Sequence, residues 1–133
     1  MKVAIAHDVR DLSSHQLGRF GEKIAAEHLR AERMQLLDRN WRHSSGEIDL
    51  IARHRDEVVF CEVKTRRSVT YGGPGEAIDA KKLTHLRKLA RHWLREHATW
   101  DQPWRIDHLL LIATSSHHFQ LQHLRGLRQC HTT

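Results

Sequence analysis

The sequence predicts an α/β domain in which a central mixed sheet of five strands is flanked by helices. Three strand-like runs follow one amphipathic helical segment, and two more follow a second such segment. Because the second helix stands between the third and fourth strands, it can form a crossover that joins them in parallel. The hairpin-length connection between the second and third strands favours an antiparallel pair. This order of elements therefore indicates a mixed sheet.

Two segments with apolar residues at helical spacing predict the helices. The first runs from Ser13 to Met34, and either Ser13 or Ser14 can supply its N-cap. The second runs from Glu76 to His97. Its apolar stripe consists of Ala77, Ile78, Leu83, Leu86, Leu89, Ala90, Trp93 and Leu94.

Runs rich in Ile, Leu, Val and Phe predict the strands. The first three cover residues 35–41, 46–52 and 57–64, and the polar stretch 53–56 between the last two suits a hairpin. Two further strands are predicted at 104–113 and 119–124. Residues 66–77 contain three glycines and a proline, which indicates an exposed loop.

Length and composition indicate one soluble domain. The chain has 133 residues, of which 39% are hydrophobic and 29% charged, and no apolar run approaches the roughly 18 residues that span a bilayer. The sequence contains two cysteines and no export signal, so we expect a cytoplasmic protein. We expect a flexible N-terminus at 1–12, a single domain at 13–125 and a basic tail at 126–133.

The charge balance makes polyanions plausible partners. Twenty-two Lys and Arg residues stand against 16 Asp and Glu residues, for a net charge of +6. The second predicted helix has no acid between residues 81 and 95, and its cations form either a solvated face or a surface for nucleic-acid phosphates. The candidate phosphate-binding residues are Lys81, Lys82, Lys88 and Arg91.

Charged residues interrupt the second and third strands. Alternation along the strand places Glu62 and Lys64 on one face. A tight hairpin would place Asp49 opposite Glu62 and Glu47 opposite Lys64. Two ionised carboxylates roughly 5 Å apart repel by about 3 kcal/mol at an effective dielectric of 20, and a divalent cation between them would reverse the sign. The pattern indicates either a Mg²⁺ or Mn²⁺ site or ordinary ion pairs on a solvated face.

Several motifs closely resemble the YraN-type family of small bacterial proteins, part of the endonuclease-like PD-(D/E)xK superfamily and akin to archaeal Holliday-junction resolvases. They are "GRFGEKIAAEHL", "GEIDLIA", "VVFCEVKTR" and "EAIDAKK", and the similarity extends through "RIDHLLL". The resemblance implies a restriction-endonuclease-like fold with Asp49, Glu62 and Lys64 as catalytic residues. It also implies that Glu22 joins Asp49 and Glu62 as a metal ligand. Ile48 stands where the superfamily's name has proline.

From these observations we expect a Mg²⁺- or Mn²⁺-dependent endonuclease that hydrolyses DNA, by analogy branched or structured DNA. The alternative is a non-catalytic nucleic-acid-binding module that retains the nuclease fold. Two-fold junction substrates would suit a homodimer. His117, His118 and His123 lack the spacing of a zinc site, and Asp107 is expected to anchor Arg105 or a neighbouring strand outside the active site.

Overall fold

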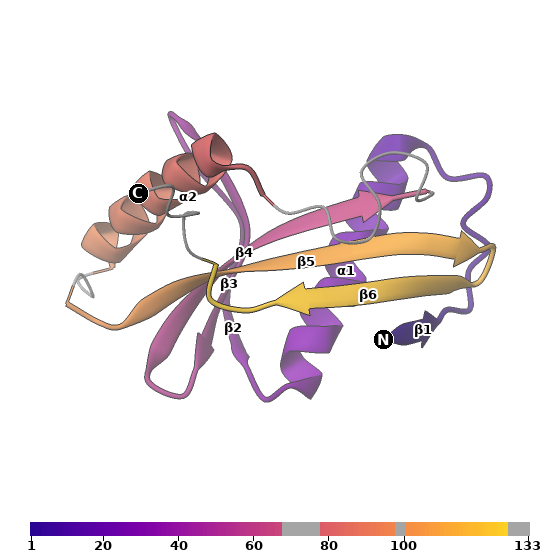
Figure 1. The fold of residues 1–133 in the computed structure, drawn as a ribbon, viewed down its shortest axis with the longest axis horizontal. Coiled ribbons are helices and arrows are strands. Elements are labelled where there is room, and N and C mark those ends of the chain that lie inside the picture. Colours follow the sequence, from indigo (N-terminus) through magenta and orange to yellow (C-terminus); the bar gives the residue numbers. More distant parts are fainter. Residues whose placement is uncertain (68–77, 98–100, 128–133) are drawn as a thin grey trace.

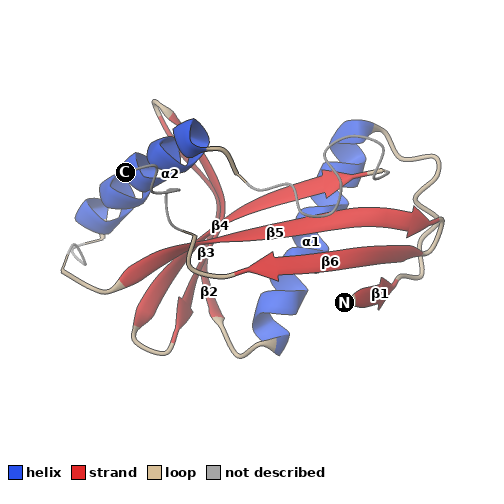
Figure 2. Cartoon of the chain, viewed as in Figure 1, coloured by secondary structure: helices blue, strands red, loops and turns tan. Residues whose placement is uncertain are grey.

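The computed structural model describes residues 1–67, 78–97 and 101–127. They form eight elements and one continuous six-stranded sheet in the order β1-β6-β5-β4-β3-β2 (Figures 1 and 2). The elements are β1 (Lys2–Ala4), α1 (Ser14–Ala31), β2 (Gln35–His43), β3 (Gly46–His54), β4 (Glu57–Arg66), α2 (Ala80–Glu96), β5 (Trp104–Ser115) and β6 (His118–Leu124). No helix in these described ranges is long and apolar enough to cross a membrane.

The α/β class and the mixed sheet are confirmed. Strands β4 and β5 run parallel, and all other neighbouring pairs are antiparallel. The predicted count of five strands was one too low. The additional strand, β1, lies in the segment 1–12 that was expected to be a flexible N-terminus, and it pairs with β6. A strand of three residues is too short to show an alternating pattern, and Val9 of the same segment is buried in the core.

Both helices begin at side-chain caps. Ser13 accepts a hydrogen bond from the backbone of Gln16 at 3.1 Å, and the Gln16 side chain accepts one from Ser13 N, which makes a reciprocal capping box. Asp79 caps α2 by accepting from Lys82 N at 2.8 Å. This cap explains why α2 begins at Ala80, four residues later than the sequence suggested.

Each helix covers its own face of the sheet. The α1 face buries a cluster that includes Leu29, Leu50 and Cys61, and the α2 face buries another that includes Phe60 and Trp93. In Figure 1, α1 passes behind β4, β5 and β6, whereas α2 lies beside the β2–β3 end of the sheet. The apolar stripe predicted for α2 is buried from Leu83 to Leu94.

Strands β3 and β4 diverge partway along their length, at a position we call the strand fork. Their pairing begins at His54 and Glu57 next to a two-residue turn and ends at Leu50 and Cys61. Beyond that point β4 continues beside β5 as far as Arg66 and Ile112. The β2–β3 turn instead lies against α2, where the rings of His43 and His92 stack with centroids 4.2 Å apart. The fork therefore opens between the two helices.

Helix α1 approaches β4 closely at Gly21. A Cβ atom at this position would lie 3.0 Å from Thr65 Cβ, with Thr65 Oγ1 nearer still. Glycine is therefore required at this contact, which fixes the position of the next residue, Glu22. Gly18 lies one turn earlier on the same helix and has nothing within 4 Å of such an atom.

We expect Gly21→Ala to lower the free energy of unfolding by about 1–3 kcal/mol, because the added methyl group meets Thr65. Gly18→Ala is the matched control and should raise it by about 0.5–1 kcal/mol, through helix propensity alone. Urea denaturation of both variants measures the difference. Adding Thr65→Ala to Gly21→Ala should recover part of the loss, and equal stability of the two single variants would contradict the close contact.

Candidate active site

Asp49 lies at the strand fork, where its side chain replaces a rung of the β3–β4 ladder. Its Oδ2 accepts a hydrogen bond from Val63 N at 2.8 Å. The last ladder pair is Leu50 with Cys61, so the next residues along the two strands are Asp49 and Glu62, the register predicted from the sequence. The backbone of β4 thus holds the aspartate between the diverging strands.

The Asp49 carboxyl is poorly solvated and surrounded by other acids. Burial, followed by the charge of Glu62, raises its pKa to about 7, against the lowering effect of the Val63 N–H. Glu22 and Glu47 raise it further by smaller amounts. Ionised Asp49 is therefore held at a free-energy cost that a nearby cation would remove.

The regular alternation of β3 changes at Asp49. Residues two apart on a strand normally share a face, yet Ile48 packs in the α2 cluster and Leu50 in the α1 cluster. Across the β2–β3 ladder, Asn40 stands opposite Asp49 and has a left-handed φ of +46°. Both strands are thus irregular at the same level, which turns Asp49 toward the fork and away from either core cluster.

Asn40 was not predicted as a site residue. Its Nδ2 donates to Glu22 Oε1 and to Glu47 Oε1, each at 3.1 Å, and so joins α1 to β3. The available signal was an asparagine within a strand-like run, a residue type that is depleted in strands and tolerates left-handed backbone. Glu47 bonds Asn40 and lies 3.9 Å from Arg42 Nε, so it does not form the pair with Lys64 that its register suggested.

Glu62 is 9% exposed and faces α2, like Phe60 of the same strand. Its Oε1 lies 2.6 Å from the Nζ of Lys82, the first-turn lysine of α2. Burial alone would lower the pKa of Lys82, but the hydrogen bond and charge of Glu62 outweigh it and raise the pKa. The structure thus brings Lys82 into the site, while Lys64, two residues from Glu62 on β4, is exposed.

The predicted metal ligands do not form a closed cage. Within residues 1–67, 78–97 and 101–127, no group of three or more His, Cys, Asp or Glu side chains is close enough to hold one metal ion. Glu22 lines a polar hollow of about 530 Å³ together with Asp49, whereas Glu62 is bonded to Lys82. Asp49 therefore has Glu22 on one side, in the shared hollow, and Glu62 on the other, next in the strand register. The three acids are not gathered around one point.

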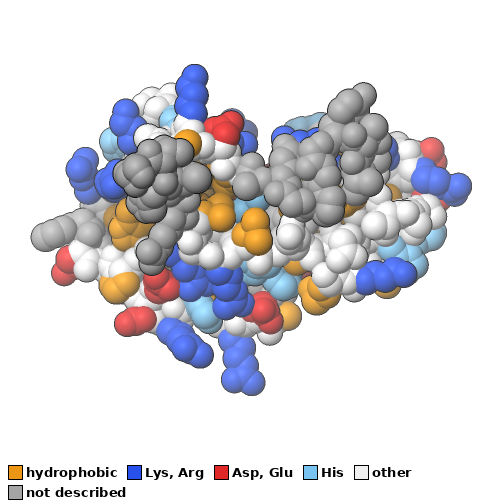
Figure 3. Space-filling view, viewed as in Figure 1, with side chains coloured by type: hydrophobic (Ala, Val, Ile, Leu, Met, Phe, Trp, Pro, Cys, Tyr) orange, Lys and Arg blue, Asp and Glu red, His pale blue; other side chains and the backbone are white. Residues whose placement is uncertain are grey.

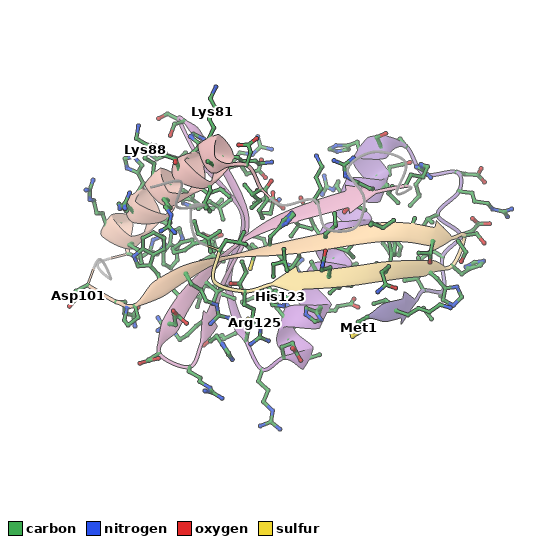
Figure 4. The ribbon with its side chains drawn as sticks, viewed as in Figure 1. Met1, Lys81, Lys88, Asp101, His123 and Arg125 are labelled. Atoms are coloured by element: carbon green, nitrogen blue, oxygen red, sulfur yellow. The ribbon has the colours of Figure 1, made fainter. Side chains whose placement is uncertain are left out.

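The predicted phosphate-binding residues of α2 separate into different environments. Lys82 is bonded to Glu62, and the Arg91 guanidinium lies 5.8 Å from the centroid of Trp104. Lys81 and Lys88 project outward from the helix (Figure 4). On the face seen in Figure 3, Lys and Arg side chains occur over α2 and also along the lower border, so positive charge is not confined to one helix.

Asp107 lies outside this site, as expected. It is fully buried and accepts hydrogen bonds from Arg105, from the His123 ring at 2.8 Å and from Gly126 N at 2.9 Å. Burial alone would raise its pKa, but these bonds outweigh it and lower the pKa. The carboxylate thus anchors both Arg105 and the end of β6. The exposed loop predicted at 66–77 lies outside the described part of the chain apart from Arg66, which ends β4, and Arg67. The final six residues also lie outside it.

Comparisons with known proteins agree with the motifs. A family model described as "Uncharacterised protein family UPF0102" matches residues 21–111. A UPF0102 protein of Beutenbergia cavernae is 43% identical over 111 residues, covering 84% of this chain and 94% of the relative. One from Paenarthrobacter aurescens is 46% identical over 111 residues, covering 84% and 92%.

Among solved structures, Pyrococcus furiosus SfsA in complex with Ca²⁺ matches with a TM-score of 0.42 and 15% identity. The match covers 87% of this chain and 65% of that chain, so this chain spans just under two thirds of the length of that protein. The family match covers Gly21, Glu22, Asp49, Glu62 and Lys64, the residues of the quoted motifs. The chain therefore belongs to the UPF0102 family, the YraN-type family that its motifs resemble.

Proposed function

We propose that this protein is a divalent-metal-dependent endonuclease that hydrolyses DNA. The observation that carries the proposal is the half-buried Asp49 carboxyl, held by Val63 N at the strand fork beside Glu62 with its pKa raised to about 7. A purely structural strand pair gains nothing from this repulsion. A restriction-endonuclease-like fold, with acids at a fork between two strands, is part of the same proposal.

The donor set suits Mg²⁺ or Mn²⁺. Both prefer carboxylate oxygens, and Mg²⁺ is usually held by only one or two carboxylates with waters and substrate phosphate oxygens in the other positions. Asp49 and Glu62 supply the two carboxylates, so a three-acid cage is not required. Glu22, the additional ligand implied by the family motif, accepts from Asn40 through one oxygen and is not gathered with Asp49 and Glu62 around one point.

Bound metal would polarise the scissile phosphate and lower the pKa of the attacking water. The other roles fall to side chains of this chain. Lys64, exposed at the end of β4, places a positive charge beside the reacting phosphate. Asn40 orients Glu22 and Glu47, and Lys82 neutralises Glu62. If Glu62 held the metal, its carboxylate would be shared between the metal and Lys82 or would leave the ion pair.

A second candidate is a nucleic-acid-binding module that does not cleave. The Lys82–Glu62 ion pair favours it, because it occupies one of the two proposed ligands. Under either function DNA is the proposed partner, with branched or structured forms and a homodimer proposed by analogy with resolvases. The exposed cations of α2, Lys81 and Lys88, are a proposed outer contact for the DNA backbone.

The endonuclease proposal predicts Mg²⁺- or Mn²⁺-dependent cutting of linear, flapped or four-way DNA by the purified protein. Lys64→Ala and Glu62→Gln should each lower the cleavage rate by at least about a hundredfold, because the first removes the positive charge beside the reacting phosphate and the second removes a proposed metal ligand. Lys2→Ala on β1 is the control and should cut normally. Salt-sensitive binding by wild type, with no cutting of any substrate in either metal, would favour the binding module instead.

The half-buried Asp49 carboxyl predicts a pH-dependent cost to stability. The pKa of Asp49 is about 7 in the folded protein, above its usual value of 3.8. The contribution of Asp49 to the stability of the fold is therefore fully present below about pH 4, and it is lost as the pH rises through about 7. Relative to Asp49→Asn, wild type should lose up to about 4 kcal/mol of unfolding free energy between pH 4 and pH 8, measured by urea denaturation.

The control for this experiment is Asp56→Asn in the exposed β3–β4 turn. Its unfolding free energy should not rise relative to wild type between pH 4 and pH 8. Mg²⁺ at saturating concentration should stabilise wild type at pH 8 and leave Asp49→Asn unchanged, because only the ionised carboxylate binds the metal. Parallel pH profiles of wild type and Asp49→Asn would contradict the raised pKa.

The ion pair between Lys82 and Glu62 predicts competition with metal. Lys82→Met removes the cation bonded to Glu62, so it should tighten Mn²⁺ binding about threefold to tenfold, as expected for loss of a competing pair worth about 1 kcal/mol. Isothermal titration of Mn²⁺ into the protein measures this directly. Lys81→Met, one residue earlier on α2, should bind Mn²⁺ like wild type. Unchanged or weaker binding by Lys82→Met would show that Glu62 is not a ligand.

A further inference from the structure

Three acids of the candidate site, Glu22, Glu47 and Asp49, lie in a groove between α1 and β2. The groove is made of two adjoining polar hollows. The larger has a volume of about 530 Å³ and the smaller about 240 Å³. Arg19, Glu22 and Asn40 line both, so the hollows are continuous at the position where Asn40 bonds Glu22. Glu47 and Asp49 form the rest of the acidic floor in the larger hollow.

Cations border this acidic floor from both walls. Arg19 and Lys23 are four residues apart on α1 and therefore lie on one side of the helix, and Arg39 and Arg42 belong to β2. All four are exposed. Arg42 lies 3.9 Å from Glu47, and the other three form no ion pair within the described residues. We call Arg19, Lys23, Arg39 and Arg42 the groove rim.

The acids of the groove are held mainly by a neutral side chain. Glu22 and Glu47, the acids next to the rim, are bonded to the Asn40 amide, and Glu47 also lies 3.9 Å from Arg42. The groove therefore keeps Arg19, Lys23 and Arg39 at its edge, with no acid partner among the described residues, above a floor of acids.

We propose that the groove between α1 and β2 binds one unpaired strand of nucleic acid, whose phosphates are held by Arg19 and Lys23 on one wall and by Arg39 and Arg42 on the other. This inference rests on the proposed function for the place of the reacting phosphate, which lies over Asp49, the proposed metal ligand at the floor of the larger hollow. It assigns strand binding to α1 and β2 rather than to the cations of α2.

The shape of the groove favours a single strand. The floor acids Glu22, Glu47 and Asp49 are half-buried, whereas the four rim cations are exposed, so a phosphate must descend between the two walls to reach the floor. An unpaired strand can follow the floor, whereas a strand in a duplex is held to its partner by the base pairs. Enzymes that act on buried atoms of a nucleic acid meet the same constraint, and they act on single strands or extrude the target nucleotide.

The lining also indicates how the strand is recognised. The residues of the two hollows include cations, acids, Asn40 and the small residues Ser14 and Gly18, and His15 supplies the one ring. Proteins that bind single strands by stacking use exposed aromatic platforms, which these hollows do not contain. Contact through phosphates alone carries no base sequence, so binding should be tolerant of sequence and steeply dependent on salt.

The test is binding of a fluorescent oligothymidylate and of a hairpin duplex, measured by anisotropy over a range of salt concentrations with Ca²⁺ as the divalent ion. In the rim variant, Arg19, Lys23, Arg39 and Arg42 are all replaced by Gln. The charge-matched control replaces Lys2, Arg30, Arg33 and Arg55, which are exposed and outside both hollows. A third variant replaces the three rim arginines by Lys and so preserves the charge.

Wild type should bind the single strand more tightly than the duplex. The rim variant should lose at least tenfold in affinity. The slope of the logarithm of its binding constant against the logarithm of the salt concentration should become less steep by close to 3, at about 0.7 for each lost phosphate contact. The control and the lysine variant should retain most of the wild-type affinity and slope. Wild-type affinity and slope in the rim variant, or tighter binding of the duplex by wild type, would overturn the inference.

The outcome also separates this inference from the endonuclease proposal. Binding in Ca²⁺ is measured without any cutting, so a protein that binds through the rim but never cleaves DNA would retain the inference and lose the proposed function. A protein that cleaves in Mg²⁺, but whose rim variant binds like wild type, would retain the function and lose the inference.

Discussion

The hydrogen bond from Val63 N to Asp49 Oδ2 is the interaction on which the candidate site depends. It takes the place of a backbone rung and closes the β3–β4 ladder with a side chain, so that β4 can remain beside β5 while β3 turns toward α2. A backbone N–H left without a partner at this position would cost about 1–3 kcal/mol. The same hydrogen bond thus gives the Val63 N–H a partner at the strand fork and fixes the Asp49 carboxyl there.

The two helices hold the two sides of this fork. Gly21 brings α1 against Thr65 of β4, and the stacked rings of His43 and His92 hold the β2–β3 turn against α2. Glu22 therefore comes from one face of the sheet and Lys82 from the other. This arrangement explains why acids that belong to different layers influence one carboxyl, and why the charges at the site come from α1, β3, β4 and α2 together.

Much of this was predictable from local patterns. Alternation and the length of the 53–56 connection were sufficient to align Asp49 with Glu62, because a two-residue turn sets the register of every later pair. The site's charge balance was not predictable in the same way. The Lys82–Glu62 pair depends on where α2 docks, the role of Asn40 depends on one left-handed residue, and β1 is too short for a pattern. Each of these follows from tertiary packing, which no short window of sequence contains.

The missing side chain at Gly21 also has a mechanical consequence. Because the helix backbone rests directly on Thr65, α1 cannot slide or rotate over β4 without collision, and the neighbours of these two residues, Glu22 and Lys64, are carried on a single rigid body. Helix α1 and β4 therefore form one side of the fork, and the β2–β3 hairpin with α2 forms the other. Glu22 and Lys64 thus belong to one side of the fork, and the hairpin that bears Asp49 belongs to the other.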